Sequence, residues 1–376
     1  MYNENEIRGF LALRHNVNIT KTQCRRIIVR LGLKRNNCEA AMDQIYNEIL
    51  KLHSAGYRDA GYKTVWRILN TQGIRATQET VRHLLLIMDN EGVELRKHHR
   101  LRRRMYSCAG PNHILHIDGY DKLKPYGFPI HGGIDGFSRK ILWLKILRSN
   151  NNPYVVSRLY FDHLIDIGRI PKIIRSDAGN ENVVVADFHK VIRTFHSDRL
   201  AGNNSFMTGR STANQRIEMI WSFLTKHFTQ YWRNLFKDLI DVGLLNTADP
   251  EEIELIRFCF KSPMQKHLDA FKDYWNSHRI RSQRDVESPT GVAPDVLYHQ
   301  AELFGRRDCS VNLPVSVQSL IGLRDQFSIE EPNFGCSNEY LRIIWDITHG
   351  NLEIPQSSQD GLRLYGNLRT ILFNAN

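Results

Sequence analysis

Three stretches that each carry one acid read His113-Ile-Leu-His-Ile-Asp118-Gly-Tyr120, Lys172-Ile-Ile-Arg-Ser-Asp177 and Asn214-Gln-Arg-Ile-Glu218-Met-Ile-Trp221. The first two are short and rich in β-branched residues, which predicts strands with Asp118 and Asp177 near their ends. The third has apolar residues at helical spacing, so Glu218 is predicted to lie on a helix. Two strand ends and a helix can bring three acids from distant parts of the chain to one point.

A cluster of these carboxylates is costly at neutral pH, because like charges repel unless cations neutralise them. A site made only of hard oxygen ligands suits Mg²⁺ or Mn²⁺, so one of these ions is the expected cofactor. Two such ions about 3.5 to 4 Å apart can activate a nucleophile and stabilise the leaving oxygen of a phosphoryl transfer. The expected substrate is therefore a phosphodiester.

The three stretches resemble the catalytic core of the retroviral integrase and DDE transposase family, which has a ribonuclease H-like fold. The resemblance runs from Gly110 to about Tyr298 and includes a second-strand signature and a closing segment in the family's order. They read Gly133-Ile-Asp-Gly-Phe-Ser-Arg-Lys140, and Tyr274-Trp-Asn-Ser-His-Arg279 followed by Ser288-Pro-Thr-Gly-Val-Ala-Pro294. The resemblance implies that Asp118, Asp177 and Glu218 are both the catalytic and the metal-binding residues. It also implies double-stranded DNA as the partner, bound by a homo-oligomer.

One segment departs from the family pattern. After its fourth strand the family usually has Asp-Asn-Gly-(Ser or Gly)-Glu-Phe, whereas this chain has Asp177-Ala-Gly-Asn-Glu181-Asn182. The three acids are intact. Two other nearby acids, Asp121 and Asp135, are interpreted as turn or cap residues, and Glu181 as an acid that favours the start of a helix.

Composition places the 376-residue chain among soluble globular proteins, with 41% hydrophobic and 24% charged residues. It has no apolar run of about 18 residues and no signal-peptide pattern at its start, so we expect an intracellular protein without a membrane partner. A nuclear location is expected for a DNA-binding protein of this kind. The six cysteines stand singly, which predicts neither a disulfide framework nor a structural zinc site. They are Cys24, Cys38, Cys108, Cys259, Cys309 and Cys336.

Positive charge is concentrated at the N-terminal end. The formal net charge is +11, and residues 1–110 hold 20 Lys or Arg against 10 Asp or Glu. Such a surface attracts nucleic acid in a salt-sensitive and sequence-independent way. Residues 1–110 are therefore the expected polyanion-binding part.

Residues 1–37 are predicted to form a first helix-turn-helix. Thr20 or Thr22 can cap its second helix, whose Ile27, Ile28 and Leu31 are expected to be buried. The opposite side would present polar residues to base edges and phosphates. These are Gln23, Arg25, Arg26 and Arg30. A small helical bundle with a solvated basic face is the alternative.

Residues 38–95 are predicted to hold a linker helix, at about 39–53, and a second helix-turn-helix. Apolar residues mark one helix before Gly73, and Thr77 can cap the next one. Arg82 is the expected DNA contact on that helix. Two such units in tandem resemble the DNA-binding end of many transposases.

Residues 96–110 form a basic linker that includes Arg102, Arg103 and Arg104. A run of this kind is usually solvated. It can hold DNA phosphates or serve as a nuclear localisation signal, and both interpretations stay open. In the core, Lys226 lies two helical turns after Glu218 and is a further expected phosphate contact.

The predicted fold class is α/β. The resemblance implies a ribonuclease H-like integrase core at 111–300, which follows the all-α tandem helix-turn-helix region and precedes a mainly α extension at 301–376. Strands are predicted at about 113–119, 129–134, 140–147 and 172–176. Helices are predicted at about 153–167, 180–194, 213–231, 235–245, 250–260 and 264–276, with a mobile loop at 196–212.

Three functions follow from these patterns. The first is a metal-dependent integrase or transposase that cuts and joins DNA. The second is an element-derived protein that binds DNA while its core is inactive. The third is a nuclease that cuts RNA, which is disfavoured because no segment resembles an RNA-binding module.

Overall fold

The computed structural model describes residues 3–32, 40–57, 60–88, 107–209, 214–282, 289–351 and 353–373. Its contacts divide the chain into two compact units. The first comprises Met1–Pro111, Phe137–Lys140 and Asp273–Asp308. The second comprises Asn112–Gly136, Ile141–Lys272 and Cys309–Asn376. In the residues described, no helix is both long enough and apolar enough to cross a membrane.

A five-stranded sheet forms the centre of the second unit, with the strand order β3-β2-β1-β5-β6. β1, β2 and β3 are antiparallel, whereas β5 runs parallel to β1 and β6 parallel to β5. This order and direction, with α7 (Pro153–Ile167) before the parallel strands, confirm the ribonuclease H-like fold. The strands are β1 (Ile114–Tyr120), β2 (Ile130–Asp135), β3 (Ile141–Ile146), β5 (Ile173–Ser176) and β6 (Phe206–Thr208).

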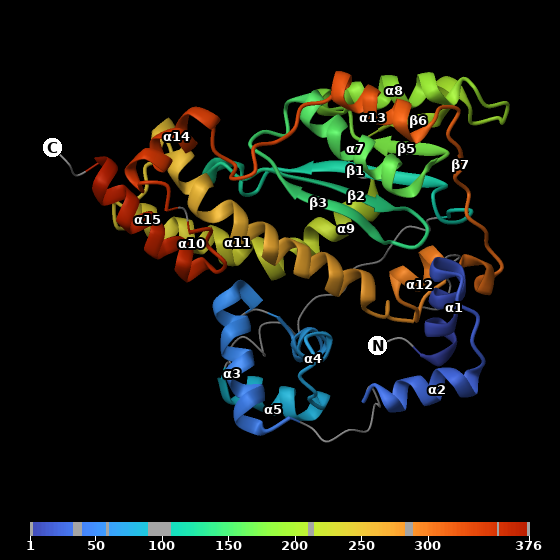
Figure 1. Cartoon of the computed structure of the whole chain (residues 1–376), viewed down its shortest axis with the longest axis horizontal. Coiled ribbons are helices and arrows are strands. Elements are labelled where there is room, and N and C mark those ends of the chain that lie inside the picture. The colour runs from blue at the N-terminus through green and yellow to red at the C-terminus, as the bar shows by residue number, and fades with distance from the viewer. Residues whose placement is uncertain are drawn as a thin grey trace. The chain divides into compact units, whose positions relative to one another are not determined.

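The two faces of the sheet bury different kinds of side chain, because successive residues of a strand point to opposite faces. Leu115 and Ile117 of β1 belong to an apolar core with residues of α7, α8 (Val183–Arg193) and α13 (Val317–Phe327). The other face meets α9 (Gln215–Leu224), which contacts β1 and β2. Figure 1 shows α7, α8 and α13 on one side of the sheet and α9 on the other. His116, Asp118 and Tyr120 therefore face α9.

The helical stretch after Asn214 continues beyond α9. A π-helical turn, Thr225–Thr229, joins α9 to α10 (Gln230–Asp241), and α11 (Pro250–Ser277) follows. The prediction of two helices at 250–260 and 264–276 is wrong, because α11 passes through Pro263. Proline removes one hydrogen bond from a helix. The buried side chains of Phe260 and Met264 hold the two halves in one element.

The predicted mobile loop at 196–212 contains regular structure in its described part. A 3-10 turn (Gly202–Ser205) leads into β6, whose Phe206 pairs with Ile174 of β5. A strand of three residues is too short to show the alternation by which strands are predicted. The prediction of a loop is wrong for residues 206–208.

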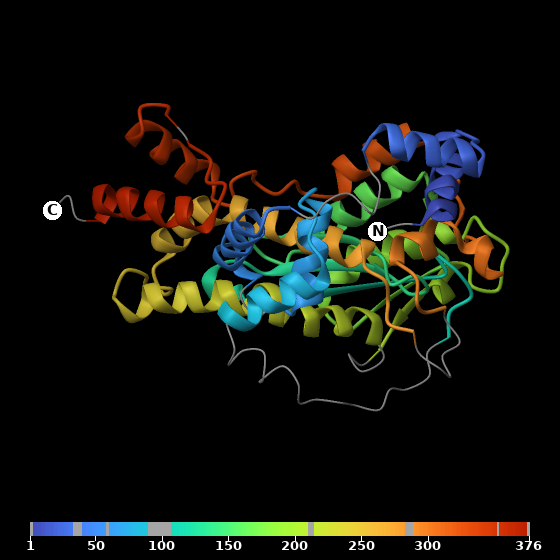
Figure 2. The same ribbon diagram turned by 90° about the horizontal axis from the view of Figure 1, so that it is seen from below.

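From Cys309 onward, the C-terminal region belongs to the second unit. β7 (Val311–Asn312) pairs with β4 (Arg169–Ile170), and Leu320 of α13 is fully buried in the α7 core. Farther on, α14 (Asn338–Ile347) precedes α15 (Ser358–Phe373), which lies beside α11 in both views (Figure 1, Figure 2). The Tyr365 hydroxyl of α15 donates to the Leu244 carbonyl at 2.7 Å. The region thus completes the fold of the second unit.

The first unit begins with the predicted pair of helices, α1 (Glu4–His15) and α2 (Lys21–Arg30). Thr20 caps α2, with Gln23 in a reciprocal capping box. The expectation that Ile27 and Leu31 are buried is wrong: they are 36% and 59% exposed, and Cys24 is the buried residue of α2. Ile28, one turn after Cys24, is half-buried, so only the side of the helix that carries these two residues packs inward.

A second group of helices in the first unit shares one core. It consists of α3 (Met42–Leu52), α4 (Tyr62–Thr71) and α5 (Gln78–Met88). Thr77 accepts a hydrogen bond from the Thr80 backbone N–H at 3.1 Å, as expected of a helix cap. The predicted linker helix is part of this core, because Ile45 and Ile49 of α3 pack with residues of α4 and α5. In the same unit, Gln300 after α12 (Pro294–His299) donates to the Glu6 carbonyl at 2.8 Å.

Candidate active site

Asp118 and Asp177 come from neighbouring parallel strands. β1 pairs with β5 so that Ile114 lies beside Ile173 and His116 beside Arg175. Two residues further on, the same register brings Asp118 level with Asp177, which directly follows β5. Neighbouring strands lie about 4.8 Å apart, and residues at one level of parallel strands share a face. The register therefore makes neighbours of two acids that are distant in the sequence.

Glu218 lies in the first turn of α9, and polar side chains anchor the start of this helix to the sheet. The Asn214 amide donates to the Ile117 carbonyl at 3.0 Å. Its Oδ1 contacts His116 Nδ1 at 2.5 Å. The Arg216 Nε donates to the Gly136 carbonyl at 3.0 Å. These bonds fix where Glu218 stands relative to β1.

Asp118 is 8% exposed and has two hydrogen-bond donors. Trp221 Nε1 donates to its Oδ2 at 2.8 Å, and the Gly119 backbone N–H donates to its Oδ1 at 3.0 Å. Burial raises the pKa of Asp118 to about 7, opposed by the Trp221 hydrogen bond, while the charges of Asp177 and Glu218 raise it further. Both neighbours lie within reach of electrostatic interaction, so the three acids share one region.

Asp177 is the common neighbour of the surrounding acids. Burial and then the charge of Asp177 raise the pKa of Glu218. Burial likewise raises the pKa of Glu181, with further contributions from Asp177 and Asp121. The Glu181 carboxylate folds back over the loop, where a Cβ on Gly179 would lie 2.1 Å from Oε2. Glu181 is thus a fourth carboxylate beside Asp177 rather than only a helix-start acid.

The side chains as they stand do not form a closed metal site. Among the described residues, no three or more His, Cys, Asp or Glu side chains gather closely enough to hold a metal ion. The donors nevertheless fit a hard divalent ion, since Asp118, Asp177 and Glu218 offer only carboxylate oxygens, and the charges of Asp177 and Glu218 both act on Asp118.

The predicted DNA contacts differ in what they already bind. Gln23 is engaged in the helix cap, and Arg25 forms an ion pair with Glu4 at 2.8 Å. Lys226 is exposed on the π-helical turn that directly follows α9, the helix that carries Glu218. Three further arginines are also exposed, namely Arg26, Arg30 and Arg82. Arg102, Arg103 and Arg104 lie outside the described residues.

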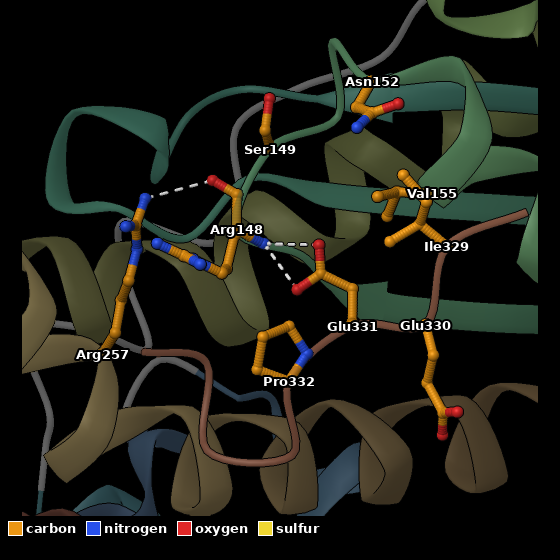
Figure 3. A pocket seen from close by; sticks show the side chains of 9 residues that line it. All are labelled: Arg148, Ser149, Asn152, Val155, Arg257, Ile329, Glu330, Glu331 and Pro332. Carbon is orange, nitrogen blue, oxygen red and sulfur yellow. Dashed lines mark hydrogen bonds between the residues drawn. The ribbon is translucent and has the colours of Figure 1, made fainter. Parts of the chain in front are cut away.

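A separate cavity of about 470 Å³ lies where the segment around Glu331 crosses the core, and none of the three acids lines it (Figure 3). Its charged groups bind one another. The Arg148 backbone N–H donates to Glu331, and Arg257 donates to the Arg148 carbonyl at 3.1 Å. Arg148 also pairs with Glu254 at 2.8 Å. The bond to Glu331 attaches the C-terminal segment to Arg148, and the other two bonds attach Arg148 to α11.

Sequence reasoning missed two residues of this region, Trp221 and Asn214. Asn214 stands one helical turn before Glu218 and Trp221 almost one turn after it. Side chains three or four residues apart share a helix face. This spacing was the available signal that both residues accompany the acid.

Comparison with known families agrees with the geometry. A family model described as an integrase core domain matches residues 105–303, which is more than half of the chain. No curated protein matches the sequence. The matched range contains the whole sheet, α9 and the three acids. The chain, with its ribonuclease H-like sheet, therefore belongs to the integrase core domain family.

Proposed function

We propose that the chain is a divalent-metal-dependent enzyme that hydrolyses DNA phosphodiester bonds and transfers the cut strand to a second DNA. Asp118, Asp177 and Glu218 are the proposed catalytic and metal-binding residues. The observation that carries the proposal is the β1–β5 register, which brings Asp118 level with Asp177 on the face that α9 covers. Membership of the integrase core domain family supports the reaction class.

The chain's own contribution is position and charge. When bound, Mg²⁺ or Mn²⁺ would supply Lewis-acid polarisation of a phosphoryl oxygen and a more acidic bound water. Asp118, Asp177 and Glu218 would hold the ion through carboxylate oxygens. The burial of Asp118 limits water at the site and strengthens its electrostatic interactions. No side chain is required as a covalent nucleophile, so catalysis rests on orientation and charge neutralisation.

Double-stranded DNA is the proposed substrate, bound by a homo-oligomer because cutting and joining involve paired ends. In the first unit, α4 and α5 form two helices of one core with an exposed Arg82, which fits a DNA-binding helix pair. Arg26 and Arg30 extend the basic surface of α2. Lys226 would contact a phosphate next to the acids. Such contacts predict DNA binding that weakens as salt rises.

The test is metal-dependent nicking and joining by the full chain and by Asp177→Asn. The variant keeps the size of the side chain and removes its charge, so activity should fall at least about a hundredfold. Asp166→Asn is the matched control, because Asp166 is an exposed acid of α7 on the other side of the sheet. It should keep full activity.

The other outcomes select the other functions. Undiminished nicking by Asp177→Asn would refute this site. Tight DNA binding by the native chain without metal-dependent cleavage of any substrate would favour the DNA-binding protein with an inactive core. Faster cleavage of RNA/DNA hybrids than of DNA would favour the RNA-cutting nuclease.

A further inference from the structure

Trp221 reaches the candidate site from the same helix as Glu218. Its Nε1 donates to Asp118 Oδ2 at 2.8 Å, and its side chain is buried, with 6% exposure of the residue. Its ring lies 5.0 Å from the Tyr120 ring, centroid to centroid. The indole thus contacts both Asp118 and the next residue that faces α9 on β1.

The strand opposite Asp118 leaves room for this indole. Gly132 of β2 pairs with Asp118 in the antiparallel register. A Cβ on Gly132 would lie 2.7 Å from the Trp221 ring tip and 2.9 Å from Leu144 Cδ2. Carbon atoms at such a separation overlap, so any side chain at position 132 would push the ring away. A glycine at this point of the sheet is therefore a condition for the Trp221–Asp118 hydrogen bond.

The other side of the indole is held through Tyr120. The Tyr120 hydroxyl lies 2.7 Å from Thr225 Oγ1 and 2.9 Å from Thr229 Oγ1, the first and last residues of the π-helical turn. Thr225 Oγ1 also donates to the Trp221 carbonyl at 2.8 Å. Tyr120 is thereby fixed against α9 on the same face of β1 as Asp118. The indole is enclosed by Gly132, Tyr120 and its own helix.

We propose that Trp221 is a positioning residue that fixes the orientation of the Asp118 carboxylate for the metal ion, and that Gly132 makes this possible. The inference rests on the proposed function of the site. Each carboxylate oxygen has two lone pairs. Trp221 occupies one on Oδ2 and the Gly119 N–H one on Oδ1, so each oxygen keeps one for a cation. Outer hydrogen bonds of this kind orient ligands and tune metal affinity.

The test has two measurements on the full chain. Electron paramagnetic resonance measures Mn²⁺ binding, and a kinetic assay measures DNA nicking. Trp221→Phe keeps a ring and removes the donor. Gly132→Ala keeps the donor and displaces the ring. Both should bind Mn²⁺ about 10- to 100-fold more weakly than the native chain, with lower kcat and unchanged KM for DNA.

Trp143→Phe is the matched control. Trp143 is equally buried in the same sheet, and its Nε1 donates to His131 at 3.1 Å, away from Asp118. It should leave Mn²⁺ binding within about twofold of the native value. A variant that is only less stable should bind Mn²⁺ as Trp143→Phe does, when each protein is measured at the same distance from its own unfolding midpoint.

Native Mn²⁺ affinity in Trp221→Phe and Gly132→Ala, with binding lost in Asp118→Asn, would overturn the inference and leave the proposed function intact. Equal weakening in all three tryptophan and glycine variants would also overturn it, because the effect would then be general loss of packing. A native chain that binds Mn²⁺ in an Asp118-dependent way but cuts no DNA would refute the proposed function while the binding data still decide the role of Trp221. If no Mn²⁺ binding depends on Asp118, both fail.

Discussion

The substitution Leu320→Ala tests whether the C-terminal region is an integral part of the second unit, which contains the candidate site. Leu320 lies on α13, is fully buried and packs in the core that also holds Leu115 and Ile117 of β1. Removing a buried leucine side chain costs its transfer free energy and leaves a cavity, together about 2 to 5 kcal/mol. The free energy of unfolding of a folded domain is only about 5 to 15 kcal/mol, so Leu320→Ala should lose a large share of its stability.

The assay is urea unfolding of the full chain at pH 7.5, followed by tryptophan fluorescence, because Trp143 belongs to the same core. Val317→Ala on the same helix is the control. Val317 is 42% exposed, so its truncation should cost less than about 1 kcal/mol. Equal free energies of unfolding for the two variants would refute the inclusion of α13 in the core. A larger loss for Leu320→Ala would mean that the core depends on residues beyond the 105–303 match.

Two further perturbations probe the anchoring of α9 and the buried histidines. Asn214→Ala removes the partner of the Ile117 carbonyl and of His116, so the free energy of unfolding should fall by about 2 to 4 kcal/mol and nicking should fall with it. Unchanged urea unfolding together with unchanged nicking would contradict the anchoring role. Burial lowers the pKa of His189 to about 3 in the folded protein. The unfolded chain therefore takes up a proton at this histidine first, so the free energy of unfolding is highest above about pH 6.5 and falls as the pH falls toward 3. At pH 5 this loss is about 2 kcal/mol. Urea unfolding at pH 7.5 and at pH 5 measures it. The difference between the two pH values should shrink in His189→Gln and persist in the control His83→Gln, because His83 is exposed.

The core was predictable where local pattern and tertiary packing agree. The β-branched stretches ending near Asp118 and Asp177 are strands, and the helix before Gly168 ends where glycine adopts a positive φ of 61°. Prediction failed where contacts with other elements determine the burial or the secondary structure of a residue. Leu31 has the spacing of a buried residue, yet it is exposed. The three residues of β6 gain their strand structure from pairing with β5 and carry no pattern of their own.

The difference between local pattern and tertiary contacts also explains how much of the candidate site was predictable. The sequence identifies Asp118, Asp177 and Glu218 as acids, but their relation depends on how α9 lies along β1. From His116 to Tyr120 the strand advances about 13 Å, and from Asn214 to Thr225 the helix advances about 16 Å. Over these similar lengths, Asn214 meets His116, Trp221 meets Asp118, and Thr225 meets Tyr120.

Each strand residue that faces α9 is therefore bonded by a helix residue farther along in the same direction. Glu218 stands between Asn214 and Trp221, so the two bonds on either side of it determine its distance from Asp118. A change in either bond would shift the glutamate relative to the two aspartates without altering any of the three acids. In the proposed metal site, the hydrogen bonds between α9 and β1 therefore set the spacing of the three acids.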